Sequence, residues 1–377
     1  MFFLKKLARI IRMEIKNAFE HLKFALSLCV DLPYKKMQFL LKHFSYFSQL
    51  QKTNVNSLVD LGLTPIQADS LKKIDEHMIE AHLDWLQQNN NHHVAIHGSK
   101  NYPKRLLEIA SPPKLLFIEG DITLLQQPQI AIVGSRKPTH YGLDCAKRFS
   151  FELSKAGLTI TSGLAMGIDS AAHLGALAAK GGTVAVIGTG INLNYPSKNR
   201  DIAAKLRDNG VIISEFPLSC PPLATNFPKR NRIISGLSLG TLVVEAMQKS
   251  GSLITAKFAL EQNRDVFAIP GPIHSSTSCG TNHLLQQGAK LTQSVDDILQ
   301  EYPELQPAER YPLDNLNNKL AQKHNKLLEC IEITETELNR ITHRSGLTIA
   351  ELAPILLELE TSGLIGRGNK GYYRAHP

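Results

Sequence analysis

The sequence predicts a Rossmann-like α/β domain, in which helices cover both faces of a mainly parallel sheet. Between about residues 92 and 302, six short apolar runs alternate with stretches of helical periodicity. Most of these runs hold three or four consecutive apolar residues, as expected of strands buried on both faces. Such alternation is typical of βαβ units. The strands are expected at residues 130–134, 158–163, 183–188, 211–215, 241–245 and 266–270.

Helices are predicted between these strands. The helical periodicity is clear at residues 143–155, 168–180, 197–208 and 253–262. The segment from Asn226 to Gly236 is interpreted as a short helical turn that leads into the strand at 241–245. In an open sheet of this kind, ligands bind outside the carboxyl ends of the strands, so the loops that follow the strands are candidates for function.

Two smaller units are predicted beside this domain. Residues 24–90 show helical periodicity in short segments, and Thr64 and Pro65 suit the N-cap and first position of one helix. Residues 303–323 are polar and are interpreted as a linker. Residues 324–377 predict three helices and a hairpin that turns at 368–371, the outline of a winged helix. Its third helix is acidic and apolar, which suits a protein contact at least as well as DNA.

Residues 1–23 form a basic extension with amphipathic helical periodicity. A membrane-surface helix, an additional helix of the fold, and a true start at Met13 all remain open. The sequence has no apolar run of 18 residues, so no transmembrane helix and no stable membrane insertion are expected.

Charge and cysteine content restrict the functional classes only loosely. The net charge is +8, but the first 50 residues contribute nine Lys and Arg against three Asp and Glu. The rest of the chain is therefore nearly balanced, and clusters of charge matter more than the total. The five cysteines show no CxxC spacing, which predicts neither a zinc site nor a disulfide framework. Free thiols of this kind indicate a reducing compartment, the cytoplasm.

Two cationic clusters follow predicted strands. Arg136 and Lys137 come after the first strand, and Lys229, Arg230 and Arg232 lie within four residues of one another beside Phe227. Cations near the carboxyl edge of a sheet suit a phosphate backbone.

Loops of small residues lie beside these clusters. Glycines allow the chain to approach a ligand closely, and free N–H groups before a helix can hold an anion. The small or amide residues expected to contact the ligand are Gly134, Ser135, Ser162, Gly163, Asn231, Ser250 and Gly251.

Residues that suggest catalysis also have structural interpretations. Asp169 can cap its helix, and His173 among alanines is more often a packed histidine than a catalyst. Glu215 and Glu245 can position cations instead of exchanging protons. The sequence shows no metal-ligand set and no nucleophile–base pair. These patterns favour phosphate binding without chemistry.

Taken in order, the motifs resemble the bacterial DprA (Smf) family of DNA-processing proteins. The resemblance covers about residues 95–300 and is weaker in the flanks, which are similar to that family's sterile-alpha-motif-like (SAM-like) helical domain and winged-helix domain. The motifs that carry it are Val133-Gly-Ser-Arg136, Ser162-Gly-Leu-Ala-Met-Gly-Ile-Asp169, Phe227-Pro-Lys-Arg-Asn-Arg-Ile-Ile-Ser-Gly236, Ser250-Gly-Ser-Leu-Ile-Thr-Ala256 and Gly280-Thr-Asn-His-Leu-Leu-Gln-Gln-Gly-Ala289.

The resemblance implies a non-enzymatic protein without a cofactor. Members of this family bind single-stranded DNA during natural transformation, protect it from nucleases and load the RecA recombinase onto it, as dimers built through the Rossmann-like domain. Carried onto this chain, Arg136 and the cations at Lys229, Arg230 and Arg232 hold phosphates. Phe227 either stacks on a base or anchors its loop.

Two other classes remain as alternatives. A Rossmann-like nucleotide phosphoribohydrolase has similar loops and a glutamate at a strand end, for which Glu245 is the candidate. Its Pro-Gly-Gly-x-Gly-Thr run is absent; residues 235–241 are only a distant match. An NAD-linked oxidoreductase needs a GxGxxG fingerprint, and Gly188-Thr-Gly190 follows the third strand without the last glycine.

Overall fold

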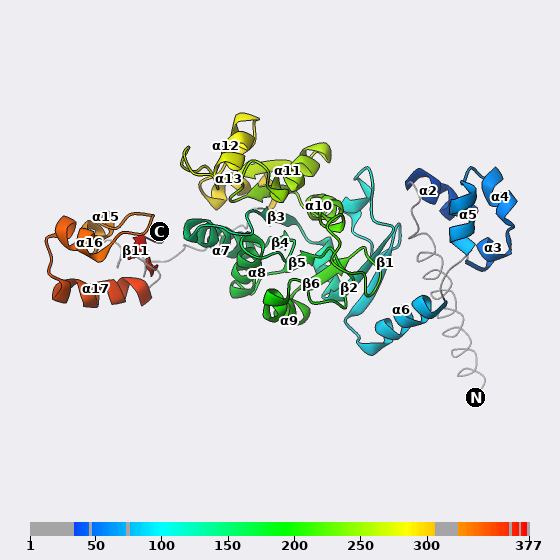
Figure 1. Cartoon of the computed structure of the whole chain (residues 1–377), viewed down its shortest axis with the longest axis horizontal. Helices are drawn as coiled ribbons and strands as arrows, with labels where there is room; N and C mark the ends of the chain where they lie inside the picture. Colours follow the sequence, from blue (N-terminus) through cyan, green and yellow to red (C-terminus); the bar gives the residue numbers. More distant parts are fainter. Residues whose placement is uncertain are drawn as a thin grey trace.

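The computed structural model describes residues 34–44, 47–72, 76–305, 323–361, 364–368 and 371–374. The basic extension at 1–23 and linker residues 306–322 lie outside the described residues. A cluster of small helices, a central sheet domain and a C-terminal helix–hairpin unit follow one another along the chain (Figure 1).

A nine-stranded sheet forms the central domain, in the order β1-β2-β6-β5-β4-β3-β7-β8-β9. The strands from β3 to β9 pair in parallel, whereas β2 pairs antiparallel with both β1 and β6. All six predicted strands are present, and three further strands, β1, β2 and β9, were not predicted. The strands are β1 (His92–Ile96), β2 (Leu115–Gly120), β3 (Gln129–Val133), β4 (Thr159–Ser162), β5 (Thr183–Val186), β6 (Val211–Ser214), β7 (Gly240–Val243), β8 (Asp265–Ala268) and β9 (Lys290–Leu291).

Helices cover both faces of this sheet, which confirms the predicted fold class. Side chains of α7, α8 and α13 pack on one face, and those of α10, α11 and α12 pack on the other. Within β3, Ile130 and Ile132 face the first group while Ala131 and Val133 face the second, because successive strand residues point to opposite faces. The helices are α7 (His140–Lys155), α8 (Ile168–Ala178), α9 (Arg200–Asn209), α10 (Asn226–Leu237), α11 (Gly251–Glu261), α12 (Cys279–Gln286) and α13 (Val295–Leu299).

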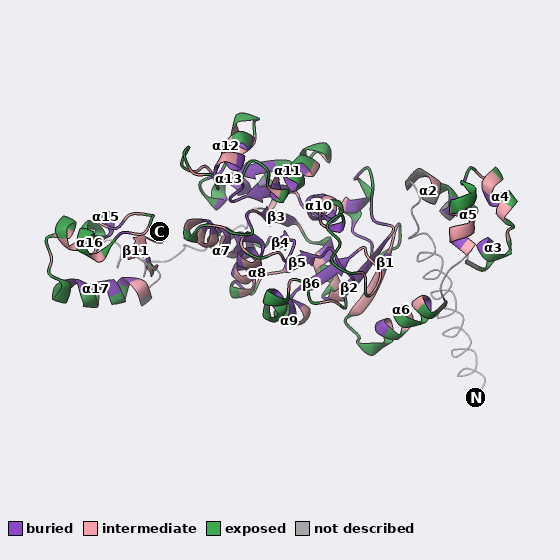
Figure 2. Cartoon of the chain, viewed as in Figure 1, coloured by how far each residue is buried: buried purple, intermediate pink, exposed green. Residues whose placement is uncertain are grey.

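Short 3-10 helices fill several of the connections. They are η1 (Lys104–Leu107), η2 (Ile122–Gln126), η3 (Ser197–Asn199) and η4 (Pro303–Leu305). Figure 2 shows the buried residues concentrated in the strands and on the inward sides of the helices.

The prediction of a short turn at Asn226 to Gly236 is wrong, because α10 is a helix of 12 residues. Its buried positions include Asn226, Arg230, Ile233 and Leu237, which share one helical face. Two of these four are polar, so the apolar periodicity that normally marks a helix is hidden in the sequence.

The strand order creates a switch point beside β3. From β3 the chain proceeds through β4, β5 and β6 on one side, then crosses over so that β7 pairs with the other edge of β3. The connections that leave β3 and β7 therefore diverge, and they open a crevice at the carboxyl ends of these two strands.

The N-terminal unit is built from short helices around its own apolar core of leucines, including Leu40, Leu50 and Leu58. Thr64 caps a helix as predicted, since its hydroxyl accepts from the Gln67 N–H at 3.2 Å. The helices are α2 (Tyr34–His43), α3 (Phe47–Lys52), α4 (Val55–Asp60) and α5 (Pro65–Lys72).

The next helix, α6 (Glu76–Gln88), lies within the range expected for the N-terminal domain but packs elsewhere. Its Ile79 and Trp85 are buried with Phe117 of β2 in a cluster of the sheet domain. The change of core therefore falls between α5 and α6, earlier than the expected boundary near residue 90.

The C-terminal unit consists of α15 (Asn325–Glu329), α16 (Leu338–Ser345), α17 (Ile349–Thr361) and the antiparallel pair β10 (Ile365–Arg367) and β11 (Tyr372–Arg374). Three helices followed by a hairpin confirm the predicted winged-helix outline. No helix among the described residues is long and apolar enough to cross a membrane.

Candidate nucleic-acid interface

A cleft of about 770 Å³ lies at the switch point. We call it the switch-point cleft; its walls are the loops that follow β3, β4, β5, β6 and β7, together with α10 and the start of α11. Four of the predicted site residues, Ser162, Gly163, Lys229 and Arg232, do not line it. The predicted residues that do line it are Gly134, Ser135, Arg136, Lys137, Phe227, Arg230, Asn231, Ser250 and Gly251.

The loop after β3 presents the first cationic cluster to solvent. Gly134 lies so close to α8 that a Cβ at this position would be 2.6 Å from the Ile168 side chain. The buried Ser135 hydroxyl accepts from the Lys137 N–H at 3.1 Å, which curls the loop outward. Arg136 and Lys137 are consequently both exposed at the cleft.

Arg136 also lies against an aromatic surface. Its guanidinium carbon is 5.8 Å from the ring centroid of Phe227, within the range of a cation–π contact. Phe227 is half-buried and sits on Gly188, where an added Cβ would be 2.9 Å from the ring. The close approach at Gly188 thus fixes the Phe227 ring at the cleft.

The loop after β4 is held from inside the protein. The buried Ser162 hydroxyl donates to the Ile132 carbonyl at 2.6 Å. The carboxylate of Asp169 accepts from the N–H groups of Gly163 and Ala165, at 3.1 and 3.3 Å. The donors of Ser162 and Gly163 that were expected to meet DNA therefore have partners within the protein.

Arg230 is buried as well, although the sequence predicted an exposed phosphate contact. Its Nη1 donates to the carbonyl oxygens of Gly163 and Val186. Burial lowers the pKa of Arg230 to about 10 despite the opposing effect of Asp169, so the guanidinium stays charged near neutral pH. Burial likewise raises the pKa of Asp169, against the opposing effect of Arg230. The hydrogen bond from Arg230 to the Gly163 carbonyl ties α10 to the loop after β4.

The remaining cations of α10 differ in their surroundings. Arg232 donates to both carboxylate oxygens of Glu215, at 3.0 and 2.6 Å, so its charge is already paired. Lys229 is exposed on the helix surface outside the cleft wall. Asn231 lines the cleft and donates to the Gly251 carbonyl at 3.2 Å, which joins α10 to the start of α11.

The loop after β7 closes the other side of the cleft. Ser250 is the N-cap of α11, and its hydroxyl accepts from the Ser252 N–H at 3.3 Å. Gly251 has open space where a Cβ would lie. The first turn of α11 thus brings a partial positive charge to the cleft.

The two residues with the strongest catalytic interpretation lie outside the cleft wall. Glu245 is buried and accepts from the N–H and hydroxyl of Thr139, at 3.0 and 2.5 Å. His173 is fully buried, and its Nδ1 lies 2.7 Å from the Thr183 hydroxyl. Both fill structural roles.

Several cleft residues were not predicted, most notably the apolar ones at its rim. Tyr195, Met247 and Ile254 line the cleft and are 45%, 51% and 38% exposed. The only signal for them in the sequence is that they follow strands 183–188 and 241–245, since single apolar residues in loops are common.

The lining of the cleft contains one acidic residue, Asp169, and no histidine, cysteine or glutamate. In the part of the chain that the structure describes, no three His, Cys, Asp or Glu side chains are grouped to hold a metal ion. Exposed cations beside aromatic and apolar surfaces suit a ligand with both phosphates and bases.

Two family models match the chain. Residues 93–303 match the family described as DNA recombination-mediator protein A, and residues 312–369 match the DprA winged helix domain. Protein Smf of Escherichia coli is 42% identical over 325 residues, covering 84% of this chain and 86% of its own. The DNA processing protein DprA of Bacillus subtilis is 46% identical over 208 residues, covering 55% of this chain and 70% of its own.

Solved structures extend the match to the fold. The crystal structure of DprA from Streptococcus pneumoniae has a TM-score of 0.64 at 36% identity, covering 75% of this chain and 97% of that one. DprA from Helicobacter pylori, studied for its single-stranded DNA binding mode, has a TM-score of 0.52 at 30% identity, covering 57% and 97%. With this fold, this winged helix and these matches, the chain belongs to the DprA (Smf) family of DNA-processing proteins.

Proposed function

We propose that the protein binds single-stranded DNA without sequence preference in the switch-point cleft. One observation carries the proposal: exposed Arg136 lies over the ring of Phe227 at the carboxyl ends of the central strands. A cation and an aromatic face at one place meet both parts of a nucleotide, the phosphate and the base. The single-stranded DNA binding described for the Helicobacter pylori relative supports the same interpretation.

The proposed contacts divide by exposure. Arg136, Lys137 and Lys229 hold phosphates, because all three are exposed. Asn231, Ser250 and the loop at Gly134 and Ser135 supply polar contacts, and Gly251 keeps the chain close to the DNA backbone. Phe227 stacks on a base, which is sequence-tolerant because every base has a π-face.

The other predicted site residues act indirectly in this proposal. Ser162, Gly163 and Arg230 shape the loops, since their polar groups are engaged inside the protein. Arg232 supports the site through its pair with Glu215.

In the cell, the protein protects DNA that enters during transformation and loads RecA onto it, as a cytoplasmic homodimer without enzymatic activity. The family membership supports this role. Exposed apolar side chains such as Ile273 and Leu291 near α12 and β9 are consistent with a contact between sheet domains. The described cysteines are free thiols, which suits a reducing compartment.

The test is fluorescence anisotropy with labelled oligothymidine of about 20 nucleotides, since single domains cover up to about 16. A matched duplex and a series of salt concentrations complete the measurement. We expect tight binding to the single strand that weakens steeply with salt, and weak binding to the duplex. Replacing Arg136 and Lys229 together by alanine should flatten the log–log salt dependence by about 1.4, because each phosphate contact contributes about 0.7.

Two results would contradict the proposal. Equal affinity for duplex and single strand would show that the cleft does not bind exposed bases. Unchanged affinity and salt dependence in the double variant would show that DNA binds elsewhere on the protein.

A further inference from the structure

We propose that Tyr195 is a second nucleobase-stacking surface, which carries the bound strand from Phe227 toward the loop after β5. The inference rests on the proposed function and extends it, because it assigns a binding role to a residue outside the cationic motifs. The contact it predicts is with a base and not with a phosphate.

The position of the Tyr195 ring is the first support. Tyr195 lines the switch-point cleft, and 45% of its surface is exposed. Its ring centroid is 5.7 Å from that of Phe227, with the two planes tilted by 37°. The rings are therefore neighbours that do not stack face to face; Arg136 lies over the Phe227 ring, and the exposed Tyr195 ring is open to a base.

The spacing of the rings determines how bases can use them. A base sandwiched between two rings needs two stacking separations of about 3.5 Å each, or about 7 Å. The observed 5.7 Å is too short for such a sandwich. Successive bases on successive rings fit this geometry, and the strand then continues past Phe227 to Tyr195.

The loop that carries Tyr195 is firmly held. Asn192 accepts from the Ser219 N–H at 2.7 Å, and the Leu193 N–H donates to the Gly190 carbonyl at 3.0 Å. On the other side, the Asn199 amide donates to the Leu164 carbonyl at 2.8 Å. A fixed aromatic loses little conformational freedom when a base stacks on it.

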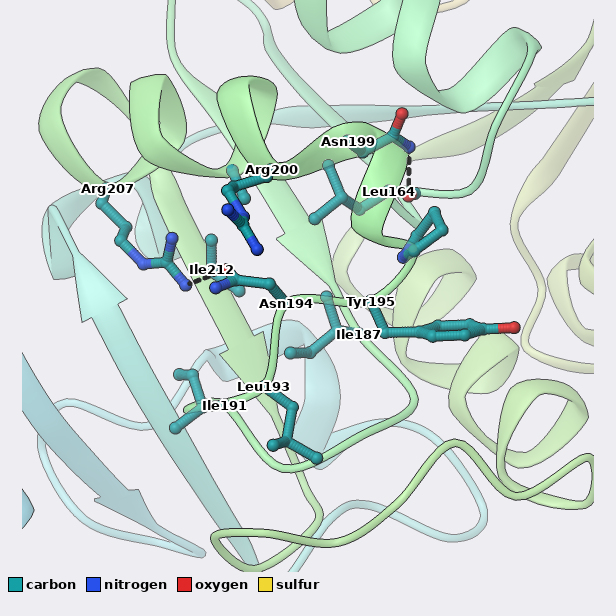
Figure 3. Close-up of a pocket in the computed structure, with 12 residues that line it drawn as sticks. Leu164, Ile187, Ile191, Leu193, Asn194, Tyr195, Asn199, Arg200, Arg207 and Ile212 are labelled. Atoms are coloured by element: carbon teal, nitrogen blue, oxygen red, sulfur yellow. Dashed lines mark hydrogen bonds between the residues drawn. The ribbon is translucent and has the colours of Figure 1, made fainter.

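Packing of the loop does not account for the exposed ring. Ile187, Ile191 and Ile212 are among the apolar side chains that line a small pocket beside this loop (Figure 3). The Tyr195 ring extends away from these three side chains (Figure 3). Lys198 and Arg200, two exposed cations that follow in the chain, suit the phosphates of the same strand.

The test compares binding of oligothymidine with binding of an abasic oligonucleotide of equal length, for wild type, Tyr195→Ala and Tyr195→Phe. We expect Tyr195→Ala to weaken binding of oligothymidine about 5- to 150-fold, the range for loss of one base–aromatic stack. Tyr195→Phe should retain wild-type affinity because the ring remains. Binding of the abasic strand should be unchanged in all three proteins.

Controls separate a stacking role from loss of structure. Phe151→Ala removes a half-buried aromatic of α7 that lines a separate cavity, and it should leave binding unchanged. Thermal melting checks each variant, and Tyr195→Leu replaces Tyr195→Ala if the alanine variant does not fold.

The outcomes distinguish this inference from the proposed function. Wild-type binding that persists at full strength in Tyr195→Ala overturns the role of Tyr195 and leaves the cleft assignment standing. Equal weakening on the abasic strand also overturns it, since no base is then involved. No binding by the wild type overturns both.

Discussion

Glu245 at the end of β7 accepts two hydrogen bonds from Thr139, at the start of α7. Thr139 is the N-cap of that helix, and its hydroxyl also accepts from the Gly142 N–H at 3.1 Å. The carboxylate thus lies at the positive end of the helix dipole, where a negative charge is favourable. The strand-end glutamate stabilises the helix that follows the Arg136 loop, and it takes no part in the cleft wall.

We therefore expect Glu245→Ala to lower the free energy of unfolding by about 0.3–2 kcal/mol, the range for a negative charge at a helix N-terminus. Glu245→Gln keeps an acceptor for the Thr139 N–H and should cost less. Urea denaturation measures both. The structural role also predicts that the wild type releases no free base from nucleoside monophosphates. Base release that disappears in Glu245→Gln would instead support the phosphoribohydrolase alternative.

Arg136 and Arg232 should behave differently on substitution, although both are cations close to the cleft. Arg136 is exposed, whereas Arg232 makes a two-point ion pair with Glu215. Arg136→Ala should flatten the salt dependence of single-strand binding by about 0.7. Arg232→Ala should leave that slope nearly unchanged and instead reduce stability. Similar slopes for the two variants would contradict this division.

The buried guanidinium of Arg230 predicts a strong stability effect. Arg230→Met leaves the carbonyl oxygens of Gly163 and Val186 without their donor and removes the positive charge that opposes the raised pKa of Asp169. It should cost about 1–3 kcal/mol for each unsatisfied acceptor. Adding Asp169→Asn should recover part of this loss, because the unpaired charge is removed. Urea denaturation of the two single variants and the double variant gives the coupling free energy between Arg230 and Asp169.

Binding measurements then test the position of Arg230. If Arg230 only shapes the loop after β4, the Arg230→Met/Asp169→Asn variant should bind single-stranded DNA more weakly, with the same log–log salt slope as the wild type. A slope reduced as much as in Arg136→Ala would show that Arg230 reaches a phosphate after all.

Most of the sheet could be predicted from sequence because strands buried on both faces are rich in apolar residues. β3 to β7 are buried throughout and β8 is buried after its first residue. β2 was missed although Leu115 to Ile118 are apolar and buried. β1 has mostly half-buried residues and β9 has only two residues, so neither leaves such a run. The full length of α10 could not be predicted, because polar Asn226 and Arg230 occupy its buried face and interrupt the apolar periodicity of the helix.

Only those site residues that belong to recognisable cationic or small-residue motifs could be predicted from the sequence. Arg136 and Phe227, which belong to the motifs singled out in the sequence, both line the cleft. Sequence spacing cannot show that Arg230 turns inward while Lys229 beside it stays exposed, because that depends on which face of α10 meets the sheet. Tyr195 was missed because its proximity to Phe227 arises from the fold, across 32 residues of chain.

His173 predicts how stability depends on pH. The Thr183 hydroxyl donates to the Ile160 carbonyl at 2.9 Å, so the His173 Nδ1–H must donate to the Thr183 oxygen. Nε2 is then unprotonated, and among the described residues it has no hydrogen-bond partner. Burial lowers the pKa of His173 to about 3, with a further contribution from the charge of Arg230.

Because the folded pKa is depressed, the unfolded chain binds this proton more readily. Above the unfolded pKa of about 6.5 the histidine is neutral in both states, so its burial does not change how the free energy of unfolding depends on pH. Below that pH the free energy of unfolding decreases as the pH falls toward 3. The slope contributed by one proton is at most about 1.4 kcal/mol per pH unit. Urea denaturation between pH 7 and pH 4.5 should show a smaller decrease for His173→Gln than for the wild type. His274→Gln, which changes an exposed histidine, should follow the wild type. An identical decrease in all three proteins would mean that carboxylates, and not His173, govern the acid sensitivity of the fold.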